Sequence, residues 1–98
     1  MEVRFEDERL EQLYRDKDAD GGYSKEIVKT FRKRMQFIKS AKDERDFYAW
    51  RSLRFEKLKG KRRYQRSIRL NDQWRLVVEF EGKGPNKTVV VIGIEDYH

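Results

Sequence analysis

The feature of this sequence that most constrains its fold is a nearly continuous run of β-branched residues from Thr88 to Ile94. Threonine, valine and isoleucine favour strands. An apolar run without polar alternation is typical of a strand that is buried on both faces. The run therefore predicts a buried strand, and the residues before it are expected to supply the rest of a sheet.

Two segments before this run alternate apolar and polar residues, as half-buried strands do. Their apolar positions are Tyr64, Ile68 and Leu70 in one segment and Trp74, Leu76, Val78 and Phe80 in the other. Residues 71–73 predict a hairpin turn between the two segments, and residues 82–86 predict a second turn. Near the other end of the chain, residues 3–5 fit a short edge strand.

The first half of the sequence has helical periodicity instead. The spacing of Leu10, Leu13 and Tyr14 predicts a helix over residues 7–16. A glycine-containing loop over residues 19–23 follows it. Ser24 fits the N-cap of a second helix. The apolar face of this second helix contains Ile27, Phe31, Met35 and Ile38. Residues 40–50 are less regular and rich in charged and aromatic side chains.

Together these segments predict an α+β fold, with two N-terminal helices packed on one face of a small, mainly antiparallel sheet. The length suits a single domain over residues 1–98. The absence of cysteine excludes disulfides and thiolate metal sites, and no apolar run is long enough to span a membrane. The acidic first residues are unlike a signal peptide, so a soluble cytoplasmic protein is expected.

Positive charge is concentrated in one quarter of the chain. Residues 51–75 contain ten basic and two acidic residues, a net charge of +8, whereas the rest of the chain carries a net charge of −2. An ordinary solvated surface would intersperse both signs. The excess favours a surface that faces nucleic acid, with a docking face for an acidic protein as the alternative.

If the apolar residues of the predicted hairpin share one face, Arg69 lies opposite Arg75 on the other face. Like charges directly opposite each other destabilise a sheet. Two facing guanidinium groups therefore indicate an anion between them, and a phosphate that gains charge in a transition state suits their planar shape. The alternative is that both side chains extend into water or pair with Glu79 or Asp96.

His98 is the only histidine and the last residue of the sequence. A terminal histidine is normally a frayed, solvated end. Here it follows the most apolar strand, and Asp96 and Tyr97 beside it supply a carboxylate and a hydroxyl. Such a cluster can provide a general acid or base, because histidine titrates near neutral pH.

Basic residues that could hold RNA phosphates are dense between residues 57 and 66: Lys57, Lys59, Lys61, Arg62, Arg63 and Arg66. Tyr48, Trp50 and Tyr64 have rings that could stack on bases. Aromatic residues at such positions more often belong to the core, so a core role is the expectation for these three.

Asp16 to Gly21 reproduces the first half of an EF-hand calcium loop. The twelfth position of that loop requires a bidentate glutamate, but Ile27 occupies it, with Glu26 one place earlier. No metal site is expected. The segment is interpreted as an acidic loop between two helices, closed by Gly21 and Ser24.

Three stretches of the second half resemble one known family. They are Leu53-Arg54-Phe55-Glu56-Lys57-Leu58-Lys59-Gly60, then Tyr64-Gln65-Arg66-Ser67-Ile68-Arg69-Leu70-Asn71-Asp72-Gln73-Trp74-Arg75, and the closing Glu95-Asp96-Tyr97-His98. By these motifs the chain is similar to HigB-type toxins, also called plasmid maintenance system killer proteins, of the RelE superfamily. The first half matches only in the order of its helices. The resemblance implies a RelE-like fold and cleavage of mRNA in the ribosomal A site.

The resemblance also implies the chemistry, the partner and the site. The ribose 2′-hydroxyl would attack the adjacent phosphate without a metal, and a cognate helix-turn-helix antitoxin would neutralise the toxin. Residues that match the active-site pattern are Arg75, Asp96, Tyr97 and His98, and those that match its basic surround are Lys57, Lys59 and Arg69. Many relatives have a histidine before the Leu-Lys-Gly motif, where this chain has Glu56. Glu56 could itself be the base.

The expected function is therefore ribosome-dependent mRNA cleavage without a metal or organic cofactor, with operator DNA bound only through the antitoxin complex. His98 would be the general acid, or alternatively the base, and Asp96 and Tyr97 would orient it. Arg75 and Arg69 would stabilise the pentavalent phosphorane. Two rival functions stay open: a non-catalytic protein that binds nucleic acid or ribosomes through the same basic face, and a DNA-binding regulator, although no helix-turn-helix is visible.

Overall fold

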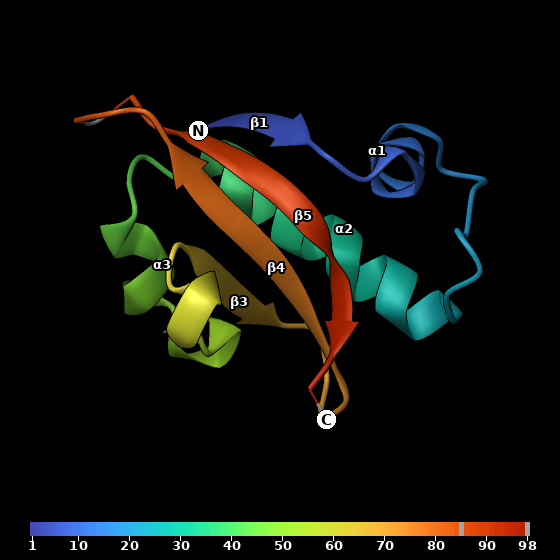
Figure 1. The fold of residues 1–98 in the computed structure, drawn as a ribbon. Helices are drawn as coiled ribbons and strands as arrows, with labels where there is room; N and C mark the ends of the chain where they lie inside the picture. Colours follow the sequence, from blue (N-terminus) through green and yellow to red (C-terminus); the bar gives the residue numbers. More distant parts are fainter. Residues whose placement is uncertain (85, 98) are drawn as a thin grey trace.

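One five-stranded sheet organises the molecule, with the strand order β1-β5-β4-β3-β2 (Figure 1). The computed structural model describes residues 1–84 and 86–97. Its strands are β1 (Glu2–Phe5), β2 (Glu56–Lys57), β3 (Gln65–Arg69), β4 (Trp74–Glu81) and β5 (Thr88–Asp96). Its helices are α1 (Glu8–Arg15), α2 (Lys25–Ser40) and α3 (Arg45–Ala49), with short 3₁₀ turns η1 (Arg51–Leu53) and η2 (Gly60–Arg62).

The β-branched run forms β5, which lies between β1 and β4. β1 pairs with it in parallel, and the other neighbouring strands are antiparallel. Burial on both faces is confirmed at Val89, Val90 and Val91, which are almost fully buried. Residues 92–94 are only half-buried, because β1 pairs with β5 no further than Val91.

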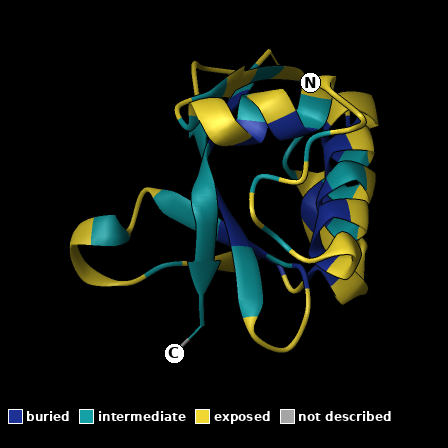
Figure 2. Ribbon diagram, turned by 90° about the vertical axis from the view of Figure 1, so that its right-hand side faces the viewer, coloured by how far each residue is buried: buried dark blue, intermediate teal, exposed yellow. Residues whose placement is uncertain are grey.

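The two predicted N-terminal helices are confirmed, and so is the predicted N-cap Ser24; Asp7, predicted inside the first helix, is its N-cap. The Asp7 carboxylate accepts hydrogen bonds from the first turn of α1, and Ser24 Oγ accepts one from Ile27 N at 3.3 Å at the start of α2. The predicted apolar face of α2 packs in one core cluster with Leu10 and Leu13 of α1 and with the sheet. Figure 2 shows this buried layer between the helices and one face of the sheet, as the α+β prediction requires.

The sequence missed α3 and β2. α3 has five residues, too few for a periodic pattern, and it forms because Phe47 is fully buried against Phe37, Phe55 and Phe80, with ring centroids 5.1–5.3 Å apart. β2 is a two-residue strand at the edge of the sheet, where it pairs with β3. The placement of Tyr64 on the buried face of a strand was wrong, because β3 begins one residue later and this ring is 66% exposed. None of the described helices is both long and apolar enough to cross a bilayer.

The predicted hairpin turn between β3 and β4 is an Asx turn. Asn71 Oδ1 accepts hydrogen bonds from Gln73 N at 2.8 Å and from Trp74 N at 2.7 Å. This turn sets the register of the hairpin and leaves Arg69 directly opposite Arg75, as the sequence predicted.

A β-bulge alters the end of β5. Val78 pairs with Val91 and Val77 pairs with Gly93, so Ile92 has no partner on β4. One extra residue reverses which side chains face the core from that point onward. Ile94 consequently packs against the helical core, and Glu95 pairs with Arg75 of β4 on the opposite face.

Candidate active site

The face of the sheet opposite α2 carries mainly polar and charged side chains, and the segment around η2 lies on this side (Figures 1 and 2). Arg75 of β4 lies on this face at the hairpin end of the strands, between its register partners Arg69 on β3 and Glu95 on β5. Alternation along the three strands aims these side chains to the same side. This face is the candidate site.

Arg75 is held in place from two sides. Its Nη2 lies 3.6 Å from Glu95 Oε1, and its guanidinium carbon lies 5.4 Å from the centroid of the Tyr97 ring. The side chain is only 19% exposed, and its Nε has no hydrogen-bond partner among the described residues. The Nε atom is itself buried, so an incoming anion would meet the exposed part of this half-buried guanidinium, at the hollow that Arg75 lines.

Glu95 is a site residue that the sequence reasoning missed. It accepts two hydrogen bonds from Arg62, at 2.8 and 2.6 Å, and Arg62 Nε also donates to Gln65 Oε1 at 2.8 Å. The Arg62 guanidinium holds the pKa of the Glu95 carboxyl below its usual value, and Arg75 acts in the same direction. Glu95 therefore links β5 to η2 and to Arg75 through ion pairs with Arg62 and Arg75. The partners of Arg75 that were expected from the sequence were Glu79 and Asp96.

Arg69 pairs with Asp72 in the hairpin turn rather than with the alternatives that the sequence suggested. The Asp72 side chain is 96% exposed, so this ion pair is exposed to water on the carboxylate side. Arg34 of α2 donates to the Arg69 carbonyl at 3.2 Å and supports the strand from the helical side. Arg69 is consequently fixed at its backbone but free to exchange its anionic partner.

Tyr97 lies beside both arginines. Its backbone N–H donates to Gln73 O at 2.8 Å, which attaches the end of β5 to the hairpin turn. Burial raises the pKa of the Tyr97 hydroxyl, and the charge of Glu56 raises it further, against opposing effects of nearby arginines. The hydroxyl is therefore neutral at pH 7 and available as a hydrogen-bond donor.

Two adjoining hollows open around these residues. One, of about 430 Å³, is lined by Arg54, Glu56, Arg69, Asn71, Asp72 and Tyr97. The other, of about 330 Å³, is lined by Glu56, Lys57, Leu58, Lys59, Arg62 and Arg75. Glu56 lines both, so the predicted candidate base lies at the boundary between the phosphate-binding candidates Arg69 and Arg75.

The predicted RNA-binding residues divide into three groups. Exposed ones, free to reach a phosphate, are Lys57, Lys59, Lys61 and Arg63, although Arg63 also stacks on Tyr64 at 4.6 Å. Arg62 forms an ion pair with Glu95, so its guanidinium already has an anionic partner. Arg66 points toward the helical side, where its Nε lies 4.0 Å from Glu44 Oε2, so the structure does not bring it to the site.

Asp96 is not brought to Arg75 either. It pairs with Trp74 in the register, on the opposite side of β5 from Glu95, and Gln73 Nε2 donates to its Oδ2 at 3.1 Å. The other residue predicted at this end, His98, lies outside the described residues.

The core role expected for the three aromatic residues was wrong. Tyr48, Trp50 and Tyr64 are 54%, 38% and 66% exposed. Tyr48 meets Phe55 edge-on, with ring centroids 4.8 Å apart, and the guanidinium of Arg34 lies 4.9 Å from the Trp50 centroid. Their inner sides are packed, and their outer sides are open for stacking.

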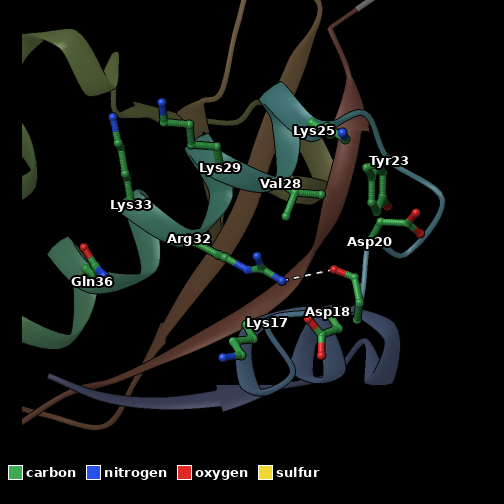
Figure 3. A pocket seen from close by; sticks show the side chains of 11 residues that line it. Lys17, Asp18, Asp20, Tyr23, Lys25, Val28, Lys29, Arg32, Lys33 and Gln36 are labelled. Atoms are coloured by element: carbon green, nitrogen blue, oxygen red, sulfur yellow. Dashed lines mark hydrogen bonds between the residues drawn. The ribbon is translucent and has the colours of Figure 1, made fainter.

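A larger hollow, of about 610 Å³, lies between α2 and the loop that precedes it (Figure 3). Arg32 reaches across this loop and donates to Asp16 O and Ala19 O, both at 3.0 Å; the latter bond is dashed in Figure 3. The Arg32 guanidinium thus forms hydrogen bonds with backbone carbonyls of the segment that resembles half of a calcium loop. Among the described residues, no group of three or more His, Cys, Asp or Glu side chains could hold a metal.

Comparison with known proteins adds to this geometry. A family model described as the RelE-like toxin of the type II toxin–antitoxin system HigB matches residues 3–98. No curated protein matches the sequence. Among solved structures, the chain is similar to a YoeB/ParE toxin from Agrobacterium tumefaciens, with a TM-score of 0.61 and 16% identity over 100% of both chains. At that identity, the likeness concerns the fold.

Proposed function

Because the chain belongs to the HigB-like family of RelE-like toxins from type II toxin–antitoxin systems, we propose that it is an endoribonuclease that cuts mRNA on the ribosome and stops translation. The observation that carries this proposal is the half-buried Arg75 guanidinium, which lies against the Tyr97 ring and, together with Glu56, lines one hollow. A type II toxin also has a protein antitoxin as its partner. We propose that this partner is a helix-turn-helix protein through which the toxin meets operator DNA.

The proposed reaction is an internal phosphoryl transfer that needs no metal or organic cofactor. The ribose 2′-oxygen forms a bond to the adjacent phosphorus, and the bond from phosphorus to the 5′-oxygen of the next nucleotide breaks. The products are a 2′,3′-cyclic phosphate and a free 5′-hydroxyl. Arg75 contacts the phosphorane and stabilises its extra negative charge, and Arg69, directly opposite on β3, adds to this stabilisation through its positive charge alone.

Two protons must move in this reaction. Glu56 is the proposed base for the 2′-hydroxyl, because its carboxylate is exposed and lines both hollows. The 5′-oxygen must gain a proton as it leaves, and the proposed general acid is His98, the only side chain of the sequence that ordinarily titrates near pH 7. Tyr97, neutral at pH 7, donates a hydrogen bond to the reacting phosphate. Orientation of His98 by Asp96 stays a prediction.

The exposed cations around the site supply the proposed RNA contacts. Lys57, Lys59, Lys61 and Arg63 surround the hollow of Arg75 or continue from it along η2, where they can meet phosphates of mRNA and ribosomal RNA. These residues come from strands and loops rather than from a recognition helix, which argues against a DNA-binding regulator. The proposed place of action is the translating ribosome in the cytoplasm.

Primer extension on cellular mRNA tests the proposal directly. After induction of the toxin without antitoxin, new 5′ ends within translated codons are expected, and they should be absent when Arg75 is replaced with alanine. Growth arrest without any new 5′ ends would contradict cleavage and favour the second candidate, a non-catalytic ribosome-binding protein. That candidate is favoured by Glu56, which stands where many relatives have a histidine.

A further inference from the structure

Arg54 adopts a backbone conformation that arginine rarely has. It ends η1 with φ 47° and ψ 51°, and it is the only described residue other than glycine with a positive φ. A side chain in this left-handed region costs free energy that glycine would avoid. Such conformations cluster at functional sites, where the side chain is needed in a particular place.

Local packing determines where the side chain of Arg54 starts. Its backbone N–H donates to Arg51 O at 3.0 Å, and its chain neighbours Leu53 and Phe55 are both buried. The left-handed residue thus turns the chain sharply between two core residues, and its own side chain remains exposed. Among the described residues, its guanidinium has no hydrogen bond and no ion pair.

Arg54 lines the hollow of about 430 Å³ together with Arg69, Asn71 and Tyr97. Its charge is close enough to oppose the rise in the pKa of the Tyr97 hydroxyl. Arg69 is the second cation there, and its partner Asp72 is almost fully exposed, so an incoming anion can displace that carboxylate at little cost. Nothing in the proposed reaction uses this unpaired guanidinium.

We propose that Arg54 and Arg69 form a second phosphate-binding site, which holds the phosphodiester next to the scissile one in the RNA chain. This inference rests on the proposed function, because the scissile phosphate is the one that Arg75 binds. The two hollows share Glu56 as a wall, so an RNA strand with one phosphate in each passes over that side chain and over Tyr97. Two guanidinium groups suit the paired oxygens of a phosphodiester better than they suit a base.

The site fixes the position of the RNA strand along the protein. Holding a neighbouring phosphate restricts sliding of the backbone, which keeps the 2′-hydroxyl beside Glu56 and the scissile phosphate beside Arg75. Arg54 is therefore a substrate-binding residue that contributes to RNA affinity and alignment rather than to proton transfer.

The test uses three substitutions. Arg54→Gly removes the guanidinium and relieves the backbone strain, whereas Arg54→Ala removes the guanidinium and keeps the strain. Arg51→Ala is the control, because Arg51 is another exposed arginine of the same short segment and lines neither hollow. Arg54→Gly should melt at no lower temperature than wild type, so any functional loss in it does not come from unfolding.

Binding is measured on ribosomes programmed with an mRNA that has a 2′-deoxynucleotide at the cut site. A neutral methylphosphonate replaces the flanking phosphate, on the 5′ side in one mRNA and on the 3′ side in another. Arg54→Gly should weaken binding by about 10-fold or more, the usual scale for losing hydrogen bonds to a charged group. One of the two methylphosphonates should weaken binding by the wild-type protein, and its effect should be clearly smaller in Arg54→Gly, where only Arg69 still contacts that phosphate.

If each methylphosphonate weakened binding by the same factor in wild type and in Arg54→Gly, the second phosphate site would be overturned. An Arg54→Gly protein that binds and cleaves like wild type would overturn it too. Failure of the wild-type protein to cut an unmodified mRNA would instead overturn the proposed function, while the binding cycle still decides whether Arg54 contacts a phosphate.

Discussion

Arg69 of β3 and Arg75 of β4 lie directly opposite each other, and each is paired with a carboxylate from a different part of the chain. Asp72, in the turn, pairs with Arg69, and Glu95, on β5, lies near Arg75. Two like charges in such positions repel each other, and the two carboxylates offset that repulsion in the absence of RNA. The pairs differ in exposure, because Asp72 lies in water and Glu95 is held by Arg62. An anion can therefore replace Asp72 far more easily than Glu95.

Replacing Arg75 with alanine should relieve the growth arrest caused by expression without antitoxin. Loss of a ligand to the transition-state phosphate typically costs about 2.7–4 kcal/mol, or roughly 100-fold or more in rate. Growth curves at matched expression measure this effect, with Arg45→Ala as control because Arg45 is an exposed arginine of α3. Full toxicity of Arg75→Ala would remove this residue from the mechanism.

Replacing Asp72 with asparagine should tighten RNA binding. The substitution removes the carboxylate that competes with phosphate for Arg69, and the exposed position makes an effect on folding small. Asp18→Asn in the loop before α2 provides a matched loss of one exposed negative charge away from the site. The dissociation constant of a non-cleavable mRNA on ribosomes is the measurement, and equal gains in both variants would indicate a non-specific charge effect.

Glu95 should make stability depend on pH in the acidic range. Its pKa is lower in the folded state than in the unfolded state, so the folded protein takes up the proton less readily. The stabilisation is fully present above the unfolded-state pKa of about 4.3 and is lost as the pH falls through the lower, folded-state value. Melting temperatures of wild type and Glu95→Gln should therefore differ at pH 7 and converge on acidification. Curves that stay parallel down to low pH would contradict this role.

Replacing His98 with glutamine should lower mRNA cleavage by roughly 100-fold or more, the usual scale for a general acid or base. The reason lies in the sequence, where this is the only histidine. Single-turnover cleavage on programmed ribosomes across a pH series measures the effect, and the limb that titrates near neutral pH should disappear in the variant. If both the rate and the pH profile are unchanged, proton transfer passes to Glu56, Lys57 or Tyr97.

Ribosome binding should weaken steeply as salt is raised, because the exposed cations act through phosphates. Reversing the charge of Lys59, Lys61 and Arg63 to glutamate should flatten this dependence, whereas reversal of Arg66, which points toward Glu44, should change it less. Sedimentation with ribosomes between about 50 and 200 mM salt provides the measurement. A salt-independent affinity would instead indicate docking on an acidic protein.

Local patterns in the sequence determined the elements and the hairpin. The period of the apolar residues gave α2 and β4, and Ser24 and Asn71 fixed a helix start and a turn through their own side chains. Because that turn sets the register by itself, the sequence alone predicts that Arg69 lies opposite Arg75. The short helix α3 could not be predicted in this way, because its formation depends on packing of Phe47 against aromatic rings elsewhere in the chain.

Only the tertiary structure decided which residues join Arg75. The bulge at Ile92 shifts the alternation of β5 by one residue, so Glu95 rather than Asp96 lies on the site face. A run of β-branched side chains suits both faces equally and gives no sign of where the extra residue goes. Likewise, the left-handed conformation of Arg54 follows from the burial of Leu53 and Phe55 on either side of it, which depends on residues far away in the chain. The sequence determined which charges are present, and long-range packing determined which of them meet.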